Sequence, residues 1–199
     1  MHVQVNSAGG ITLVPIETRH MTRRRVFIRG EINMDAACKF CDQIMLLNDQ
    51  SDTEPIDLYI TSPGGDLRAG MLMYDVIHSS QAPIRMFCQG IAYSMAAVLF
   101  ASGEHGRFLQ PHSELMLHEP LLGNAVHGNA SSIRSVSEQL LEARDKLNRL
   151  LASHTGRTEQ EIEEACRYDH FFSAEECVAF GLADAIIHPS EKQEVTNHA

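Results

Sequence analysis

The stretch of the chain best suited to chemistry runs from Gly90 to Ala97, with Ser94 at its centre. It follows an apolar run, Ile84 to Cys88, that is typical of a buried strand, and small apolar residues suited to a buried helix come after it. A serine at such a strand-to-helix corner exposes its hydroxyl beside backbone N–H groups that have no partner within the helix. Acyl transfer needs this arrangement, so Ser94 is a candidate nucleophile. The alternative is a buried serine that only begins a core helix.

A serine nucleophile needs a general base, and the base needs an acid that orients it. The chain has 11 histidines, so position must select among them. His118 is the strongest candidate because it follows the apolar run Leu115–Leu117, and α/β folds gather active sites at strand ends. His112, on the polar side of Pro111, is a rival. The acid stays open at this point, with four candidates: Asp57, Asp66, Asp145 and Asp169.

The sequence Ser62-Pro63-Gly64-Gly65 follows another strand-like run and must turn, because proline fixes φ and glycine permits positive φ. Backbone N–H groups of Gly64 and Gly65 could form an oxyanion hole, which needs two such donors. A tight turn without a catalytic role is the alternative.

Hydrophobic periodicity predicts an α/β chain in which strands and helices follow one another. Strands are expected at 25–29, 56–60, 84–88, 107–109, 114–117 and 184–187, and helices at 34–48, through 71–77, from Ser94 and at 130–153. The longest helix carries a broad apolar stripe that needs a partner, either its own domain or another subunit. Its residues are Ile133, Val136, Leu140, Leu141, Leu147, Leu150 and Leu151. Capping boxes at Thr158/Glu161 and Ser173/Glu176 predict two further short helices.

Length and composition restrict the class of protein. A chain of 199 residues fits a single domain, 1–199, with 1–10 and 189–199 as tails and 11–16 as an edge strand. The net charge of −10 argues against nucleic-acid binding. No apolar stretch reaches the ~18 residues of a membrane span, and no secretory signal is visible. The five scattered cysteines suggest a cytoplasmic protein, and Cys38 and Cys41 lie in a helical pattern without a second pair, so no metal site is expected.

Four ordered motifs resemble the successive signatures of the Clp protease proteolytic subunit family. They are Ser62–Gly65, Gly90–Ala97, Leu115–Pro120 and Asp169–Ala174. The resemblance extends from about Val26 to Ile187. It implies a crotonase-like fold, a spiral of repeated ββα units with a protruding handle helix, in which residues 119–153 form the handle region.

The resemblance also assigns roles to single residues. It implies that Ser94 is the nucleophile, that His118 is the general base and then the general acid, and that Asp169 fixes the histidine tautomer. No metal and no cofactor are implied, because ATP would be used by a partner ATPase.

The oxyanion would be bound, by the same resemblance, by the backbone N–H groups of Gly65 and Met95, with Gly64 in the substrate-binding segment. Substrates would be unfolded proteins and peptides that add as an extended strand.

The partners implied by the resemblance are further copies of the chain and a hexameric Clp ATPase. Heptameric rings would stack face to face as a tetradecamer around a closed chamber, and the ATPase would feed it unfolded chain. The family's ATPase-docking cleft is lined by aromatics, of which Tyr59 is kept, whereas Asp57 and Ser79 stand at two other aromatic positions. Losing a buried aromatic anchor costs ~2 kcal/mol, on the order of thirty-fold in affinity, so the cleft is expected to be divergent.

Two other functions fit parts of this pattern. A catalytically silent ring subunit would assemble without hydrolysing peptides, but such subunits usually lose a triad residue and this chain has all three. A crotonase-type acyl-CoA enzyme would share the oxyanion-hole scaffold but does not need the Ser–His–Asp set. Turnover of a peptide ester separates the peptidase from both.

Overall fold

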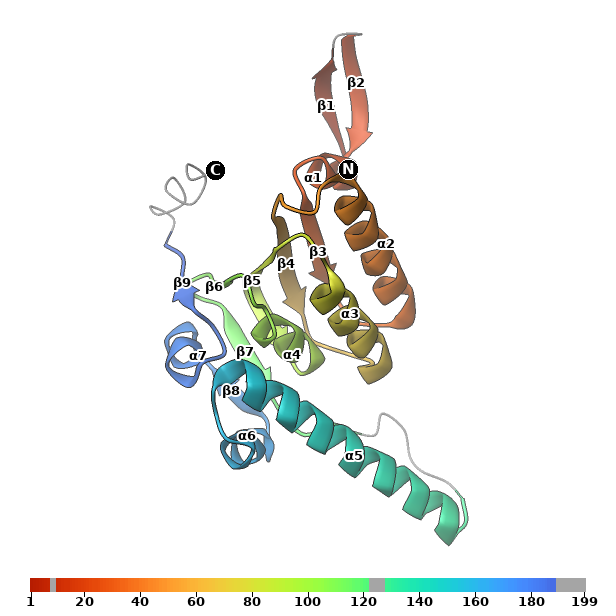
Figure 1. Ribbon diagram of the computed structural model, residues 1–199, viewed down its shortest axis with the longest axis vertical. Helices are drawn as coiled ribbons and strands as arrows, with labels where there is room; N and C mark the ends of the chain where they lie inside the picture. Colours follow the sequence, from red (N-terminus) through yellow and green to blue (C-terminus); the bar gives the residue numbers. More distant parts are fainter. Residues whose placement is uncertain (8–9, 122–127, 189–199) are drawn as a thin grey trace.

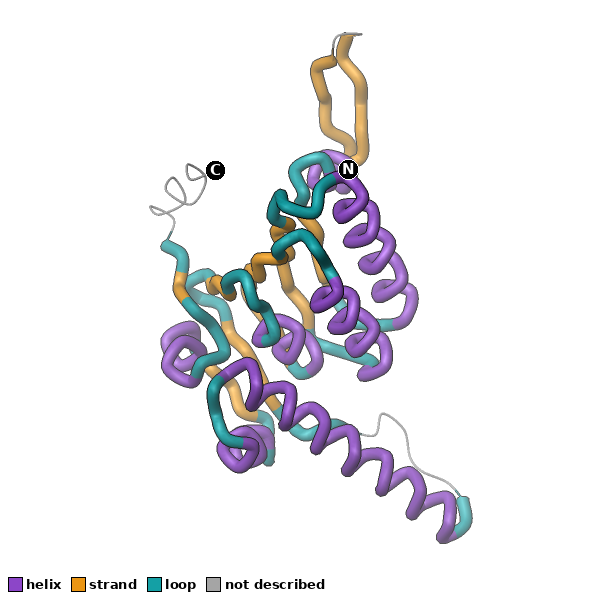
Figure 2. Tube along the Cα trace, in the orientation of Figure 1, coloured by secondary structure: helices purple, strands orange, loops and turns teal. Residues whose placement is uncertain are grey.

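The computed structural model describes residues 1–7, 10–121 and 128–188, and its centre is a seven-stranded α/β sheet (Figures 1 and 2). Five parallel strands lie side by side in the order β3 (Arg25–Arg29), β4 (Ile56–Ser62), β5 (Ile84–Tyr93), β6 (Arg107–Leu109) and β9 (Ala185–Ile186). β7 (Glu114–Leu117) pairs in parallel with the second half of β5, and β8 (His170–Phe172) pairs antiparallel with β7.

Helices lie between the strands along the chain, and those between parallel neighbours provide the crossover that such strands need in place of a hairpin. They are α1 (Ile16–Met21), α2 (Met34–Gln50), α3 (Leu67–Ser79), α4 (Met95–Ala101), α5 (Ala130–Thr155), α6 (Glu159–Cys166) and α7 (Ala174–Phe180). Both predicted capping boxes are confirmed, at Thr158 and Ser173. Backbone and side-chain bonds to these caps also hold the pKa of Glu161 and of Glu176 below the usual value.

The two faces of the sheet differ. Alternate residues of β3, β4 and β5 are buried in the core, among them Val26, Leu58 and Met86. Their neighbours on the other face include a row of stacked aromatic rings, one from each of four adjacent strands: Phe27, Tyr59, Phe87 and Phe108. Centroids of successive rings lie 5.2, 4.9 and 5.2 Å apart. These half-buried rings give this face an apolar surface.

β5 is longer than the predicted strand 84–88, because a bend at Gly90 (φ 86°) does not end it. The buried Ser113 side chain supports the bend: its hydroxyl accepts from the Gly90 N–H (3.2 Å) and donates to the Cys88 carbonyl (2.9 Å). The first half of β5 pairs with β6 and the second half with β7. β5 therefore reaches Tyr93, directly before Ser94.

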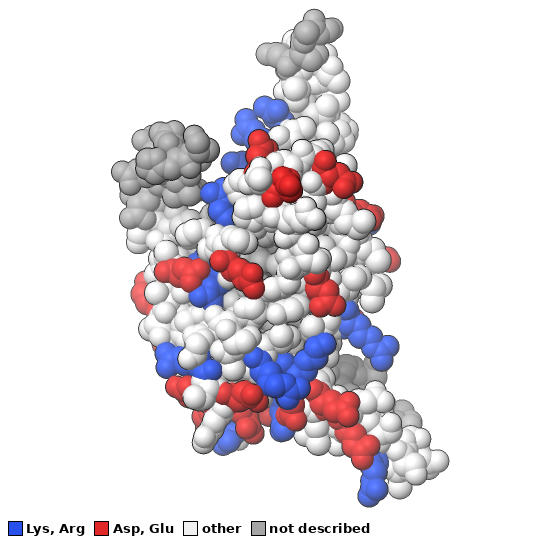
Figure 3. All heavy atoms as spheres, viewed as in Figure 1, with Lys and Arg blue, Asp and Glu red and all other residues white. Residues whose placement is uncertain are grey.

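The prediction of a loose tail at residues 1–10 is wrong for His2–Ser7, which forms strand β1 and pairs antiparallel with β2 (Gly10–Pro15). Val3 and Val5 alternate as strand residues do, and they face Val14 and Thr12 across the ladder. The hairpin projects from the body (Figure 1), and its described part is white on the face that Figure 3 shows. Residues 1–15 contain no Asp, Glu, Lys or Arg. The predicted tail at 189–199 and residues 122–127 of the handle region lie outside the described residues.

Helix α5 has two unlike halves. Its C-terminal half packs on the body, where Leu151 and Asn148 are buried. Its N-terminal half extends away from the body (Figure 1), and Ile133 and Leu141 are 50% and 47% exposed. The apolar stripe therefore has an intrachain partner at one end only, as far as the described residues show. None of the described helices combines the length and apolar character that a bilayer crossing requires.

Candidate active site

The predicted site residues follow strands that end at the same edge of the sheet. β4, β5 and β7 are parallel neighbours, so the turn at Pro63, Ser94 and His118 come directly after adjacent carboxyl ends. β8 runs the other way, so its start, next to Asp169, lies at this edge too. Chain segments far apart in sequence thus meet through the strand order alone.

Ser94 lies at a sharp corner between β5 and α4. Its backbone has φ 54° and ψ −125°, a positive φ that a non-glycine residue rarely adopts. The corner is held by a bond from the Ser94 N–H to the Met116 carbonyl (2.8 Å) and by two bonds from α4 to the Ser94 carbonyl. This conformation aims the hydroxyl away from the helix and toward the end of β7.

The hydroxyl of Ser94 meets the predicted base. Ser94 Oγ lies 2.8 Å from His118 Nε2, within hydrogen-bond distance, and both side chains are partly buried. With the proton on Nδ1, Nε2 can accept the serine proton, which is the geometry required of a general base. The structure therefore brings together the first two residues of the predicted set.

Asp169, the third residue of the predicted set, is not bonded to His118 in the structure. His118 Nδ1 is buried and has no hydrogen-bond partner among the described residues, and the side chain of Asp169 is exposed. Yet Leu117 pairs with His170 in the β7–β8 ladder, so His118 and Asp169 are the next pair beyond it. The backbone register sets Asp169 opposite His118 without joining the two side chains.

The other candidates have structural partners instead. Asp57 accepts from Arg85 Nε (2.8 Å), Asp66 caps α3 through the Ala69 N–H (2.8 Å), and Asp145 pairs with its neighbour Arg144. His112 is exposed. None of these residues bonds to His118 in the part of the chain that the structure describes.

Buried cysteines do not compete as nucleophiles. Burial raises the pKa of the thiols of Cys88, Cys166 and Cys177 to about 12 each. They stay protonated near neutral pH, and a protonated thiol is a weak nucleophile.

Gly64 lies against the Ser94 corner, Gly65 lies against Ile32, and both need to be glycine. A Cβ on Gly64 (φ 92°) would stand 2.6 Å from the Tyr93 carbonyl oxygen and 2.8 Å from Ser94 Cβ. A Cβ on Gly65 (φ 147°) would stand 2.2 Å from the Ile32 carbonyl oxygen. Met95 begins α4 directly after Ser94, and Gly65 directly follows the glycine that packs on the corner; the N–H of neither residue donates to a described residue. Two free donors next to a hydroxyl are the elements of an oxyanion hole.

Two supports of the site were missed in the sequence. Ile32 holds the glycine turn through its backbone, since its N–H donates to the Gly64 carbonyl and its carbonyl accepts from Asp66 N–H, both at 2.7 Å. Backbone contacts of this kind leave no signal in residue type. Tyr93 donates its hydroxyl to the Glu114 carboxylate, and this bond and burial raise its pKa to about 12. The two residues are diagonal neighbours, because the register sets Ile91 opposite Glu114 and Met116 opposite Tyr93, and residue type alone gave no signal for this pair.

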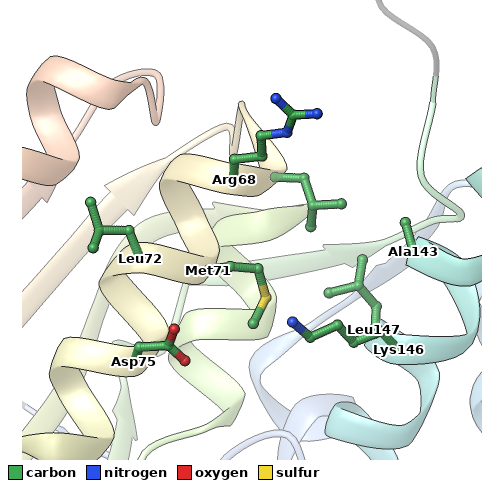
Figure 4. Close-up of a pocket in the computed structure, with 8 residues that line it drawn as sticks. Arg68, Met71, Leu72, Asp75, Ala143, Lys146 and Leu147 are labelled. Carbon is green, nitrogen blue, oxygen red and sulfur yellow. The ribbon is translucent and has the colours of Figure 1, made fainter. Parts of the chain in front are cut away.

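A groove of about 440 Å³ lies between α3 and α5 (Figure 4). Its lining is mainly apolar, from Leu67, Met71 and Leu147, with the charged Arg68, Asp75 and Lys146 among the remainder. It does not include Ser94 or His118. It adjoins the corner through α3, because Gly70, between lining residues of that helix, packs against the Met95 side chain.

Comparison with known proteins shows the family of the chain. A family model described as Clp protease matches residues 4–190. The ATP-dependent Clp protease proteolytic subunit 3 of Synechococcus sp. (strain CC9902) is 39% identical over 180 residues, which cover 89% of this chain and 90% of that protein. The chain therefore belongs to the Clp protease family of proteolytic subunits, which at the level of the family are serine-type peptidases. The resemblance stated from the four motifs is confirmed.

Proposed function

We propose that this chain is the proteolytic subunit of an ATP-dependent Clp protease and cleaves peptide bonds through a Ser94 acyl-enzyme. The observation that carries the proposal is the 2.8 Å contact of Ser94 Oγ with His118 Nε2 at a strained strand-to-helix corner. A silent ring subunit would not need to preserve this contact.

In the proposed reaction, His118 Nε2 takes the Ser94 proton as Oγ attacks the scissile carbonyl carbon. The carbonyl oxygen becomes an anion and accepts from the N–H groups of Gly65 and Met95. The protonated His118 then donates its proton to the leaving amine, and the carbon–nitrogen bond breaks. A water repeats the sequence on the ester, releases the acid and restores the serine.

Asp169 is the proposed acid, and it must move to act. A buried Nδ1 without a partner is unfavourable by about 1–3 kcal/mol, so a bond from Nδ1–H to a carboxylate would be favoured if one came within reach. The β7–β8 register sets Asp169 opposite His118, so rearrangement of residues 167–169 is enough to align it. We infer that assembly or a partner stabilises the aligned form.

The substrate is proposed to bind in extended form beside the Ser94 corner, as an added strand held by backbone hydrogen bonds. The groove beside α3 would take a side chain close to the scissile bond, and its lining of Leu67, Met71 and Leu147 favours an apolar one. Peptide libraries should show this preference at a single position, and a preference for acidic residues there would contradict it.

The proposed assembly is a pair of stacked heptameric rings built on a crotonase-like spiral, with α5 as the handle. Exposed Ile133 and Leu141 on the projecting half of α5 supply the apolar surface that another copy would cover. Leu141→Glu should therefore split the assembly into smaller species by sedimentation velocity, because it places a charge in that contact. Gln139→Glu, which adds the same charge on the same helix, is the control. Intact double rings in Leu141→Glu would contradict the handle assignment.

The ATPase is proposed to dock on the sheet face that carries Phe27, Tyr59, Phe87 and Phe108. Asp57, which stands at an aromatic position of the family's cleft, is tied to Arg85, so its charge is neutralised beside these rings. Adding a Clp ATPase and ATP should speed the degradation of an unfolded protein far more than the hydrolysis of short peptides. Equal degradation with and without the ATPase would contradict the docking proposal.

The direct test of the activity is Ser94→Ala. Turnover of a fluorogenic peptide should fall to the background because no other group at the corner can form the ester. Ser79→Ala, an exposed serine, is the control and should retain activity. Sedimentation should show unchanged assembly in both variants. Retained turnover in Ser94→Ala would assign the nucleophile elsewhere, and an assembled wild type that never hydrolyses would favour the silent subunit.

A further inference from the structure

A cluster of potential metal ligands lies away from the catalytic corner. His78 is near the end of α3, Glu104 follows α4, and His154 is near the end of α5 (Figure 1). One ligand atom from each residue lies within 4.8 Å of the other two. α4 starts beside Ser94 and spans seven residues, about 10 Å, so the cluster and the catalytic corner lie at opposite ends of this helix.

The contacts of His78 place several acceptor atoms together, and a positive charge among them would be favourable. Its Nδ1 lies 2.8 Å from the Tyr74 carbonyl oxygen and its Nε2 3.1 Å from the Ser102 carbonyl oxygen. A carbonyl only accepts, and a neutral imidazole has one N–H, so it can satisfy just one of the two. If Nδ1 donates to Tyr74, the lone pair on Nε2 faces Ser102 and the Glu104 carboxylate, 3.9 Å away. A cation among these atoms would turn repulsion into attraction.

The two imidazoles are held in place by one side chain. Tyr74 stacks on the His78 ring with centroids 3.9 Å apart, and its hydroxyl lies 2.9 Å from His154 Nε2. Such supporting contacts orient ligands in metal sites.

There is also space beside the cluster. A small cavity of about 30 Å³ is lined by His78, Ser102, Glu104 and His105, among other residues. This is on the order of the volume of one water molecule. Polar groups in this lining are the imidazoles of His78 and His105 and the carboxylate of Glu104, so the space is polar as well as small.

We propose that His78, Glu104 and His154 form a binding site for one divalent transition-metal ion of the Zn²⁺ type. Two imidazoles and one carboxylate suit Zn²⁺, Ni²⁺ or Co²⁺ better than Mg²⁺ or Ca²⁺, which prefer oxygen. Bonds of about 2.1 Å would need the ligand atoms to approach one another by roughly 1 Å, which small rotamer changes allow. The prediction of no metal considered only cysteine spacing, whereas these ligands are far apart in the sequence.

The site would be structural. His154 anchors the packed end of α5, where its carbonyl also accepts from Arg107 Nη1 at 3.1 Å. An ion bound there would join the packed end of α5 to α3 and to the turn after α4. Because it binds the folded chain only, it should raise the melting temperature.

The test is isothermal titration of the metal-free, untagged full-length protein with Zn²⁺, with thermal unfolding followed in parallel. Wild type should bind one Zn²⁺ per chain in a saturable step and should melt at a higher temperature with Zn²⁺ present. Glu104→Gln and His154→Gln should each weaken this step by more than about tenfold, because each loses a ligand. His112→Gln removes an exposed histidine outside the cluster and should bind as the wild type does.

Glu104→Gln tests the site without disturbing the fold, because the side chain of Glu104 is 62% exposed. Circular dichroism checks this. A Co²⁺ complex with visible absorption bands that are lost in both ligand variants would support the nitrogen-containing site. The proposal is overturned if no saturable Zn²⁺ step is found. A step of unchanged affinity in Glu104→Gln and His154→Gln would also overturn it. No readout depends on peptide hydrolysis, so its outcome is separate from the proposed function.

Discussion

The nucleophile corner and the segment that carries Asp169 are built in opposite ways. At the corner, Ser94 is fixed by backbone bonds, and Gly64 and Gly65 pack against neighbouring backbone at distances that exclude a Cβ. Residues 167–169 lie between α6 and β8, and all three are exposed, including Tyr168 at 79%. The first region is set by packing of this chain alone, whereas the second has little packing that would hold it.

This difference indicates how the activity is regulated in the proposed function. Nucleophile and base are already at 2.8 Å, so the chemistry depends on the orientation of His118. That orientation rests on a residue in the least packed part of the site. Segments with few buried contacts are the ones that rearrange at low free energy.

The largest loss of peptide turnover in this comparison is expected from a substitution at Asp169. Asp169→Asn keeps the shape but removes the charge that would stabilise the imidazolium, so peptide turnover of the assembled protein should fall by up to about 10⁴-fold. Steady-state kinetics on a peptide ester measures it, with Asp145→Asn as the control. A loss below tenfold would mean that His118 works without an acid and that the exposed segment has no catalytic role.

A smaller but still large effect is expected at Gly65, in the packed region. Gly65→Ala brings a Cβ to 2.2 Å from the Ile32 carbonyl oxygen, so the turn must shift and its N–H with it. Loss of one oxyanion donor costs about 10²–10³ in turnover.

Gly30→Ala is the matched control for Gly65→Ala. Gly30 also has a positive φ (72°), but an added Cβ there meets nothing within 4 Å. Both variants should lose some stability from backbone strain, and only Gly65→Ala should lose turnover. Equal kinetics in the two variants would remove Gly65 from the site.

The smallest effect on activity is expected at Tyr93, beside the nucleophile. Tyr93→Phe leaves the Glu114 carboxylate without its donor and should reduce the free energy of unfolding by about 1–2 kcal/mol, with little change in turnover.

The pH dependence of the Tyr93→Phe effect follows from the raised pKa. Folding raises the pKa of Tyr93 from about 10 to about 12. The contribution of its hydroxyl to the free energy of unfolding is therefore fully present below pH 10 and is lost as the pH rises toward 12. Urea denaturation at several pH values should show a constant difference between wild type and variant up to about pH 9 and a smaller one above pH 10. A difference that grows with pH would show that the bond acts in the opposite sense.

The sequence predicted most of the central fold and half of the site geometry for one physical reason. Ser94 and His118 each follow an apolar run that reads as a strand, and parallel strands bring their carboxyl ends to one edge. The strand-to-helix corner was therefore predictable from local patterns. The strand β5 was underestimated because the bend at Gly90 interrupts its apolar run.

What the sequence could not predict depends on long-range register. Three features depend on segments that are far apart in the chain. They are the exposed side chain of Asp169, the row of rings that contains Tyr59 and Phe87, and the cluster of His78 and His154. The strand His2–Ser7 was missed for a different reason, because a short strand with polar residues gives a weak signal.

The central claim is that Ser94 is a nucleophile activated by His118. Labelling of the assembled protein with a serine-directed fluorophosphonate, followed by intact mass and peptide mapping, tests it most directly. We expect one label per chain on Ser94, no label in His118→Ala, and slower labelling in Asp169→Asn. A label on another residue, or labelling of Ser94 at the same rate without His118, would contradict it.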